Sequence, residues 1–231
     1  MASSPARFSA ADRRQQILAV ATRLFARQGF QGTTTKEIAG GAGVTEALIF
    51  RHFRSKEELY WAVIEDKIKG SSSPRERLRM QLTEAGTDAE VLARVAADIL
   101  ERRAKDQTLS RLLLYSALEN HRLSHRFFRT YAASHYEVLS DYIRRRIADG
   151  AFRPVDPLLA ARGFLGMIIY HSWVQELFGG KRYQEFSVQE VSRTLVEIWL
   201  QGMSNPAVSQ SRNSNNGNHR ANRSYRGVSN S

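Results

Sequence analysis

Between Thr34 and Lys56 the sequence gathers hydroxyl and cationic side chains at the starts of predicted helices. Thr34, Thr35 and Lys36 open one such helix, and Lys56 opens another. Helix N-terminal amides attract anions and a lysine adds a point charge, so these four residues suit contacts with phosphate groups. The chemistry that the segment indicates is binding to a polyanion.

Short helices around one tight turn are predicted to hold these side chains. Thr34 and Glu37 have the spacing of a capping box, in which each residue satisfies a free amide of the other. Gly43 marks a helix end that needs a positive φ. Thr45 can cap a second helix over residues 46–52. Two short helices joined this tightly form a helix-turn-helix, whose second helix can enter a DNA major groove.

Flanking segments complete a small amino-terminal domain. The segment 12–29 has apolar residues at helical spacing and a stop at Gly29, and Ser55 with Glu58 repeats the capping-box spacing for a later helix. We expect a common core from these elements. Its predicted residues are Ile17, Ala21, Leu24, Phe25, Phe30, Ile38, Val44, Leu48 or Ile49, Phe53, Leu59, Val63 and Ile64.

This segment resembles the DNA-binding domain of the tetracycline-repressor (TetR) family over about residues 10–65. The family pattern is T-T-x-x-I-A, A-G-V-[ST], an aromatic residue followed by x-H-F, and S-K-x-x-L. The matching residues are Thr34, Thr35, Ile38, Ala39, Ala42, Gly43, Val44, Thr45, Phe50, His52, Phe53, Ser55, Lys56 and Leu59. The resemblance implies an all-α chain, with a three-helix DNA-binding domain followed by a helical ligand-binding and dimerisation domain.

Residues 45–52 would then be the recognition helix. Thr45, Glu46, Ala47 and Arg51 are predicted to face the bases or the strands beside them. Glu46 can accept a hydrogen bond from a cytosine amine, or it can merely steady the helix dipole. Arg51 can donate to guanine.

Other positions in this segment depart from the family pattern or have two interpretations. The resemblance favours a DNA contact for His52, which can also simply cover the core. Phe50 stands where the family usually has Tyr, and Leu48 where Thr is frequent, so two phosphate donors are missing. Gly40 and Gly41 replace better helix formers. The full predicted DNA-binding set is Thr34, Thr35, Lys36, Thr45, Glu46, Ala47, Leu48, Phe50, Arg51, His52 and Lys56.

Composition supports an anionic partner. The 231 residues carry a net charge of +11, and 42% of them are hydrophobic, enough for a real core. The absence of cysteine excludes disulfides and cysteine metal sites. No apolar run approaches the length of a membrane span, and the amino terminus lacks the apolar core of a signal peptide. We therefore expect a cytoplasmic protein that does not contact membranes.

The rest of the chain is predicted to be helical. Expected helices follow the Ser73–Pro74 cap and cover about 88–105, 109–120, 123–148, 157–177 and 187–201. The predicted domains are a flexible amino terminus (1–10), a DNA-binding domain (11–70), an effector-binding and dimerisation domain (71–203), and a basic tail (204–231). The composition of the tail, rich in Ser, Asn, Arg and Gly, is typical of disorder.

Two roles are expected for the second domain. The resemblance implies that 157–177 and 187–201 dimerise as a four-helix bundle, although ordinary intrachain packing would also use their apolar residues. Aromatic residues, methionine and a few polar side-chain ends suit a mostly apolar effector. For any single one of these residues, ordinary core packing is the stronger interpretation. The candidate effector residues are Tyr115, Phe127, Phe128, Tyr131, His135, Phe164, Met167, Tyr170, His171 and Trp173.

The sequence thus predicts a ligand-responsive transcriptional regulator, a repressor that binds a palindromic operator as a dimer. An activator, or a DNA binder without an effector, is the alternative. A catalytic or metal-binding helical protein is a distant third possibility. His121 and His125 are four residues apart, as in a metal-binding pair, but the Asn120–Arg122 segment is typical of a break between helices. We expect no catalysis, no metal and no cofactor. A membrane-surface role for the tail is disfavoured because Tyr225 is its only large apolar anchor.

Overall fold

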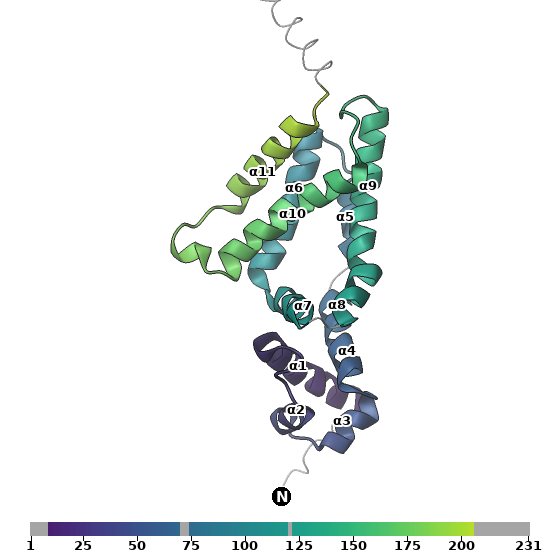
Figure 1. Cartoon of the computed structure of the whole chain (residues 1–231), viewed down its shortest axis with the longest axis vertical. Helices are drawn as coiled ribbons and strands as arrows, with labels where there is room; N and C mark the ends of the chain where they lie inside the picture. Colours follow the sequence, from purple (N-terminus) through teal and green to yellow (C-terminus); the bar gives the residue numbers. More distant parts are fainter. Residues whose placement is uncertain (1–8, 70–73, 120–121, 206–231) are drawn as a thin grey trace, which may run out of the picture. The chain divides into compact units, whose positions relative to one another are not determined.

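The computed structural model describes residues 9–69, 74–119 and 122–205, and these residues are mainly helical (Figure 1). The described residues form no strand beyond an isolated bridge between Phe152 and Ser204. The predicted all-α fold is confirmed. The helices are α1 Ala10–Gln28, α2 Thr35–Ala42, α3 Glu46–His52, α4 Lys56–Lys69, α5 Pro74–Gln81, α6 Asp88–Lys105, α7 Thr108–Leu118, α8 Arg122–Phe127, α9 Ala133–Ala148, α10 Pro157–Glu176 and α11 Val188–Met203.

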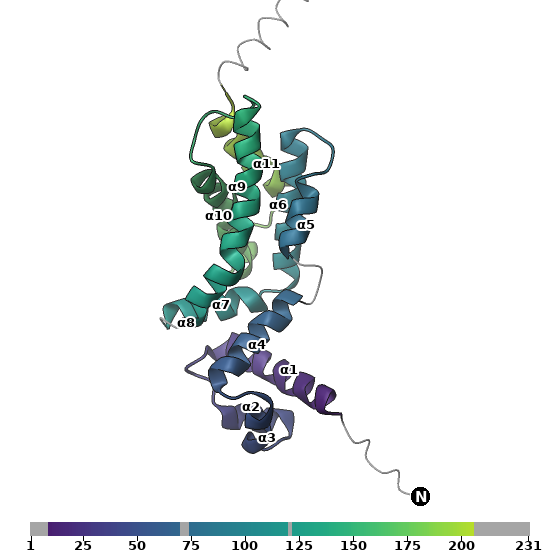
Figure 2. The ribbon, with the colours of Figure 1, turned by 90° about the vertical axis from the view of Figure 1, so that its right-hand side faces the viewer.

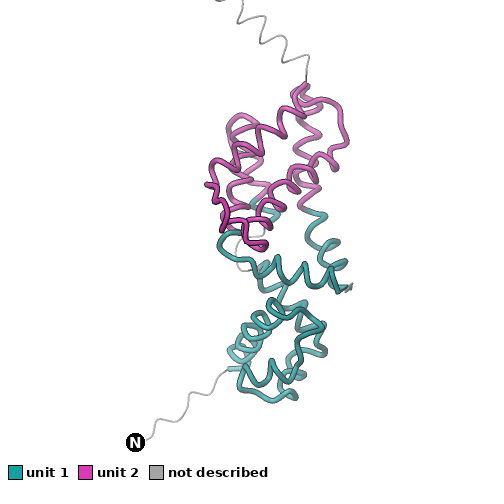
Figure 3. The backbone as a smooth tube through the Cα atoms, turned by 60° about the vertical axis from the view of Figure 1, so that its left-hand side comes forward, with its two compact units in different colours: residues 1–77, 103–134 teal, residues 78–102, 135–231 magenta. Residues whose placement is uncertain are grey.

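Contacts divide the chain into two compact units (Figure 3). Unit 1 comprises residues 1–77 and 103–134, and unit 2 comprises 78–102 and 135–231. Helices α7 and α8 therefore cluster with the amino-terminal helices, although they follow α6 in the chain. The domain boundary that the sequence places at residue 70 stays a prediction.

Unit 1 is built around α1, which packs against α2, α4 and α7 (Figure 2). The centre of its core is aromatic: the Tyr60 ring lies edge-on to Phe25 and Phe30, at centroid distances of 4.7 and 5.4 Å. The Tyr60 hydroxyl is buried with the ring and donates to the backbone oxygen of Leu112, at 2.6 Å. An α4 residue thus joins α1 and α7 through both packing and a hydrogen bond.

The local predictions for unit 1 hold with one correction. Of the two alternatives for the core, Ile49 is buried, with 1% of its surface exposed, and Leu48 is half-buried. The Ser55 hydroxyl accepts from the Glu58 amide, but the Glu58 carboxylate accepts from the Arg54 amide instead of that of Ser55. The predicted reciprocal capping box is therefore only half formed.

Unit 2 has its own core, contributed by α5, α6, α9, α10 and α11. Trp199 of α11 lies edge-on to Phe164 of α10 at 5.4 Å, and its indole N–H donates to the Ala160 oxygen at 3.2 Å. Helices α10 and α11 lie side by side (Figure 1).

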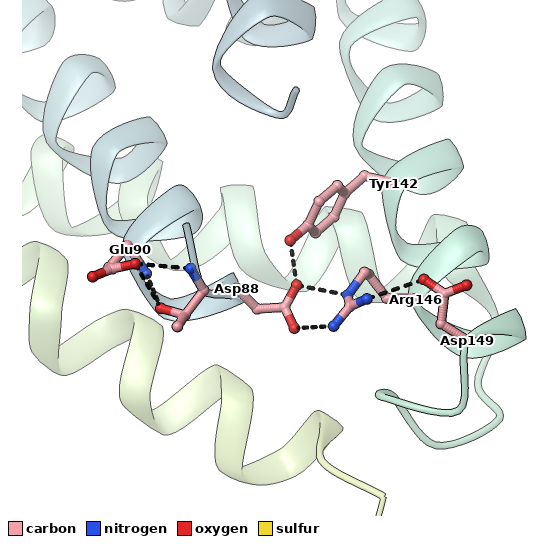
Figure 4. Close-up of polar contacts among 6 residues, drawn as sticks. Asp88, Glu90, Tyr142, Arg146 and Asp149 are labelled. Atoms are coloured by element: carbon pink, nitrogen blue, oxygen red, sulfur yellow. Dashed lines mark hydrogen bonds and ion pairs between the residues drawn. The ribbon is translucent and has the colours of Figure 1, made fainter. Parts of the chain in front are cut away.

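A charged cluster ties α6 to α9 (Figure 4). The Arg146 guanidinium donates twice to the Asp88 carboxylate, at 2.8 Å each, and once to Asp149, at 3.0 Å. The Tyr142 hydroxyl also donates to Asp88. The Asp88 hydrogen bonds raise the pKa of Arg146, and burial raises the pKa of Tyr142, so both groups keep their protons. Two parallel N–H···O bonds give this pair a fixed geometry.

The prediction of one unbroken helix over 123–148 is wrong in one respect. A π-helical turn, Phe128–Ala132, separates α8 from α9. A π turn holds one extra residue and rotates the face that follows it, which helical periodicity cannot anticipate. Tyr131, within this turn, stacks on Trp61 with ring centroids 6.0 Å apart.

Several expectations fall on parts of the chain that the structure does not describe: the 1–8 segment, the Ser73 cap, His121 and the tail from residue 206. Ser204 and Asn205 are described, and Ser204 caps α11. Within the described ranges, no helix combines the length and apolar character needed to cross a bilayer.

Candidate nucleic-acid interface

Helix α2 begins with the capping box that the sequence predicts. The Thr34 hydroxyl accepts from the Glu37 amide at 3.1 Å, while the Glu37 carboxylate accepts from the Thr34 amide at 2.7 Å and from its hydroxyl at 2.8 Å. These hydrogen bonds lower the pKa of Glu37. The Lys36 side chain is exposed beside this helix start. The remaining N-terminal amides and Lys36 together can hold an anion.

The turn after α2 is fixed from two sides. Gly43 has φ +61°, the left-handed conformation that glycine adopts cheaply, and the Val44 amide donates back to the Ala39 oxygen at 3.0 Å. From α1, the Gln16 side-chain amide donates to the Ala42 oxygen at 2.9 Å. Gln16 therefore positions this turn, a role that the sequence did not predict because no local spacing links it to a residue 26 positions away.

Helix α3 presents one face to solvent. Thr45 caps it by accepting from the Leu48 amide at 3.3 Å, and Ile49 anchors it in the core. Thr45, Ala47 and Arg51 are exposed, and Phe50 keeps 47% of its surface open. A short helix held by one buried residue, with polar and apolar side chains outward, has the form of a helix that reads a groove.

Glu46 and Thr35 bond to each other. The Thr35 hydroxyl, at the start of α2, donates to the Glu46 carboxylate, at the start of α3, at 2.6 Å. This hydrogen bond links the two helices of the helix-turn-helix and restrains the Glu46 side chain. It adds a role to the two that the sequence suggested for Glu46, and neither of those two is tested by the structure.

The remaining predicted contacts are half-buried. His52 lies at the end of α3, with its ring centroid 6.3 Å from that of Phe53. The Lys56 ammonium, at the start of α4, lies 4.4 Å from the Phe30 ring centroid. Burial lowers the pKa of Lys56, and the nearby Glu119 carboxylate opposes that shift.

The predicted effector residues are divided between the two units. Tyr115, Phe127, Phe128 and Tyr131 belong to unit 1, whereas the six from His135 to Trp173 belong to unit 2. Some of the ten already make structural contacts: the Tyr115 hydroxyl donates to the Arg27 oxygen at 3.0 Å, Tyr131 stacks on Trp61, and Phe164 is fully buried against Trp199. The effector pocket therefore remains a prediction.

Two surface cavities of unit 1 are lined by other residues. One, of about 510 Å³, is bordered by Phe53, Trp61, Arg14 and Arg126, and a smaller one of about 320 Å³ lies between α1 and α4. In the first, Arg126 covers the Trp61 ring at 3.9 Å and Arg14 covers Phe53 at 5.0 Å. One arginine of the chain itself therefore lies over each of these two aromatic rings.

Metal binding finds no support in the described part of the chain. No group of three or more histidine, cysteine, aspartate or glutamate side chains lies close enough there to hold an ion. His121 is outside the described residues, so the predicted spacing with His125 has no geometry to compare.

Comparisons with known families give a consistent result. The model for bacterial regulatory proteins of the tetR family matches residues 17–63, which include α2 and α3. The model for the C-terminal domain of AefR-like transcriptional repressors matches residues 90–202.

Individual relatives agree with these matches. AcrR, an HTH-type transcriptional regulator of Shigella flexneri, is 35% identical over 98 residues, which cover 42% of this chain and 45% of AcrR. The chain thus spans less than half of AcrR. SlmA, a nucleoid occlusion factor of Vibrio atlanticus, is 30% identical over 160 residues, which cover 68% of this chain and 80% of SlmA.

A solved structure extends the likeness to the fold. FadR from Bacillus subtilis, in complex with stearoyl-CoA, has a TM-score of 0.62 and 22% identity, covering 81% of this chain and 98% of FadR. The capped helix-turn-helix, the two family matches and the SlmA alignment lead to one conclusion. The chain is a DNA-binding transcriptional regulator of the TetR family, a non-enzymatic family, with an AefR-like carboxy-terminal region.

Proposed function

We propose that the chain represses transcription by binding a palindromic operator as a homodimer, and that a small, mostly apolar effector releases it. The observation that carries this proposal is the exposed face of α3, held by Ile49 below and capped by Thr45 at its start. In this proposal Thr45, Glu46, Ala47 and Arg51 face the bases. Leu48 and Phe50 contact sugar or thymine methyl groups, and the phosphate contacts come from Thr34, Thr35, Lys36, His52 and Lys56.

Homodimerisation is supported by the surface of α10 and α11. Leu159, Gly163, Gly166 and Tyr170 recur along α10 at helical spacing and are all exposed. A Cβ atom added at Gly163 or Gly166 would meet nothing within 4 Å. On α11, Ile198 keeps 56% of its surface open. Glycines allow two helices to approach closely, and the large apolar residues beside them supply contact area. We therefore propose that α10 and α11 of a second copy pack on this surface.

The effector is proposed to contact α10. The Trp173 indole nitrogen is buried, and no hydrogen-bond partner for it lies in the described residues. A buried donor without an acceptor is costly, and a ligand oxygen would satisfy it. FadR binds stearoyl-CoA, so acyl-CoA thioesters belong in a first screen of candidate effectors. Trp173→Phe removes the donor and should weaken the response to the true effector. An unchanged response would exclude Trp173 from the pocket.

We also propose a cytoplasmic location, because a regulator must share a compartment with the chromosome. The direct test of function is selection of bound duplexes from a random-sequence library. An inverted repeat is expected, because a two-fold dimer reads two related half-sites. A bound sequence without two-fold symmetry would contradict the dimeric model.

Single substitutions then separate the proposed roles. Arg51→Ala should cost about 1–3 kcal/mol at one base pair of each half-site and relax specificity there. Lys36→Ala should weaken binding to all duplexes alike and reduce the salt dependence. A uniform loss for Arg51→Ala would move Arg51 to the phosphate-contacting group.

A further inference from the structure

The end of helix α7 is seated against the end of helix α1. The Arg111 guanidinium donates to the Ala26 oxygen at 2.7 Å, and the Tyr115 hydroxyl donates to the Arg27 oxygen at 3.0 Å. Both oxygens belong to the last turn of α1, where carbonyls lack partners within the helix. Side chains of α7 therefore supply hydrogen bonds that α1 cannot make for itself.

One residue continues this contact beyond α1. Glu119 follows α7, and its carboxylate oxygen Oε2 accepts from the backbone amides of Phe30 and Gln31, at 3.1 and 3.2 Å. These amides lie in the turn that leads from α1 to Thr34 and α2. Two hydrogen bonds to one side-chain oxygen fix the position of that turn.

The approach is so close that it requires glycine. Gly29 has φ +76°, and a Cβ atom placed on it would lie 2.3 Å from Oε1 of Glu119 and 2.9 Å from Tyr115 Cδ1. Any side chain at this position would displace the carboxylate. Gly29 therefore has two functions: it ends α1, and it leaves room for Glu119.

The same carboxylate is near a predicted phosphate contact. The Lys56 ammonium lies over the Phe30 ring, and Glu119 contributes more than any other acidic residue to keeping it charged. The turn that leads to α2 and the Lys56 ammonium thus both interact with one carboxylate.

We propose that Glu119 is a positioning residue for DNA binding, holding the α1–α2 turn so that the start of α2 and Lys56 meet the phosphates together. The inference rests on the proposed function and deepens it. Glu119 lies inside the region that matches the AefR-like C-terminal model, whereas Phe30 and Lys56 lie inside the helix-turn-helix match. A displacement of α7 would therefore change the presentation of the DNA-binding surface, which gives effector binding a route to the operator.

Two conservative variants separate position from charge. Glu119→Gln keeps an acceptor oxygen at the same reach but removes the charge, whereas Glu119→Asp keeps the charge but shortens the reach. If Glu119 acts by position, Glu119→Asp should bind the selected operator about tenfold more weakly, and Glu119→Gln should stay within about threefold of the wild type. Glu101→Gln, an exposed glutamate of α6, is the matched control and should bind like the wild type.

Two further measurements identify the mechanism. Amide hydrogen exchange at Phe30 and Gln31 should accelerate in Glu119→Asp well below its unfolding temperature, where a purely stabilising role predicts no difference. The slope of log affinity against log salt should become shallower by about one, because phosphate contacts are lost.

The opposite pattern would overturn the inference. If Glu119→Gln is the weaker binder, or if both variants bind more tightly with steeper salt slopes, Glu119 acts through its charge. If both variants equal the wild type in affinity and exchange, it has no positioning role. If the wild-type chain binds no duplex, the proposed function is refuted instead. Amide hydrogen exchange at Phe30 and Gln31 would then still test whether Glu119 fixes the α1–α2 turn.

Discussion

The helix-turn-helix and the α10–α11 pair differ in how much of their apolar side chains is exposed to solvent. Ile49 of α3 is 1% exposed and Ile198 of α11 is 56% exposed, although both are isoleucines within helices. In unit 1 the buried apolar residues of α2 and α3, Ile38 and Ile49 among them, belong to one core with residues of α1 and α4, whereas Phe50 of α3 stays exposed. In unit 2 the outward faces of α10 and α11 retain leucine, isoleucine and tyrosine side chains. Unit 1 thus buries Ile49 within the chain itself, whereas α10 and α11 keep apolar residues exposed, which is the surface that the proposed dimer would cover.

The largest expected effect is the difference in stability between alanine substitutions at these two isoleucines. Ile49→Ala should lower the free energy of unfolding by about 2–5 kcal/mol, since it opens a cavity in a packed core. Ile198→Ala should leave the stability of the isolated monomer nearly unchanged and instead weaken dimerisation. Thermal unfolding at several protein concentrations distinguishes the two outcomes. Equal losses at all concentrations would show that Ile198 belongs to an intrachain core.

A second substitution places a large side chain on the exposed surface of α10, at Gly166. Gly166→Arg should raise the dimer dissociation constant at least about tenfold, because overpacking costs about 1–3 kcal/mol and a two-fold interface repeats the change. The open space around Gly166 means that the monomer should fold normally. Sedimentation velocity measures the dissociation constant, with Gly166→Ala as the matched control. A variant that remains a dimer at the wild-type concentration range would place the interface elsewhere.

A third substitution tests how much the ion pair between Arg146 and Asp88 stabilises unit 2, in addition to its apolar core. Arg146→Ala should cost about 1–3 kcal/mol of stability, because it leaves the largely buried Asp88 carboxylate without its bidentate partner. Arg144→Ala, on the same helix, removes an exposed ion pair with Asp141 and should cost less than about 0.5 kcal/mol. Urea unfolding measures both. Similar small losses would show that the Asp88 cluster in Figure 4 is a surface feature.

The smallest expected effect is a pH dependence. Burial lowers the pKa of His171 in the folded chain, and the Glu176 charge only partly opposes this. The folded state therefore binds fewer protons than the unfolded state near the ordinary histidine pKa of about 6.5, so stability should fall as pH decreases through that value. His171→Phe should remove this part of the pH dependence. A profile identical to that of the wild type would show that other groups cause it.

Features specified within one helical turn were predictable from the sequence. The reciprocal bonds of Thr34 with Glu37 and of Thr87 with Glu90, and the Asp156 cap of α10, all join residues three apart. Such spacings determine where helices begin, so the observed bounds of α3 and α6 follow the predicted ones closely.

Contacts between distant residues were not predictable. Phe30 and Glu119 are 89 positions apart, Asp88 and Arg146 are 58 apart, and Gln16 and Ala42 are 26 apart. Their meeting depends on how whole helices pack, which periodicity does not determine. Nothing near Glu119 in the chain shows that its carboxylate faces the amides of Phe30 and Gln31.

Base-resolved footprinting of the wild-type chain on its selected duplex tests the central claim most directly. If a pair of α3 helices enters DNA, guanine N7 methylation should be blocked in two major-groove patches, related by two-fold symmetry and centred about one helical turn or a multiple of it apart. Arg51→Ala should remove protection at the same position in both patches. Protection in a single patch, in the minor groove only, or unaffected by any α3 substitution would contradict the account.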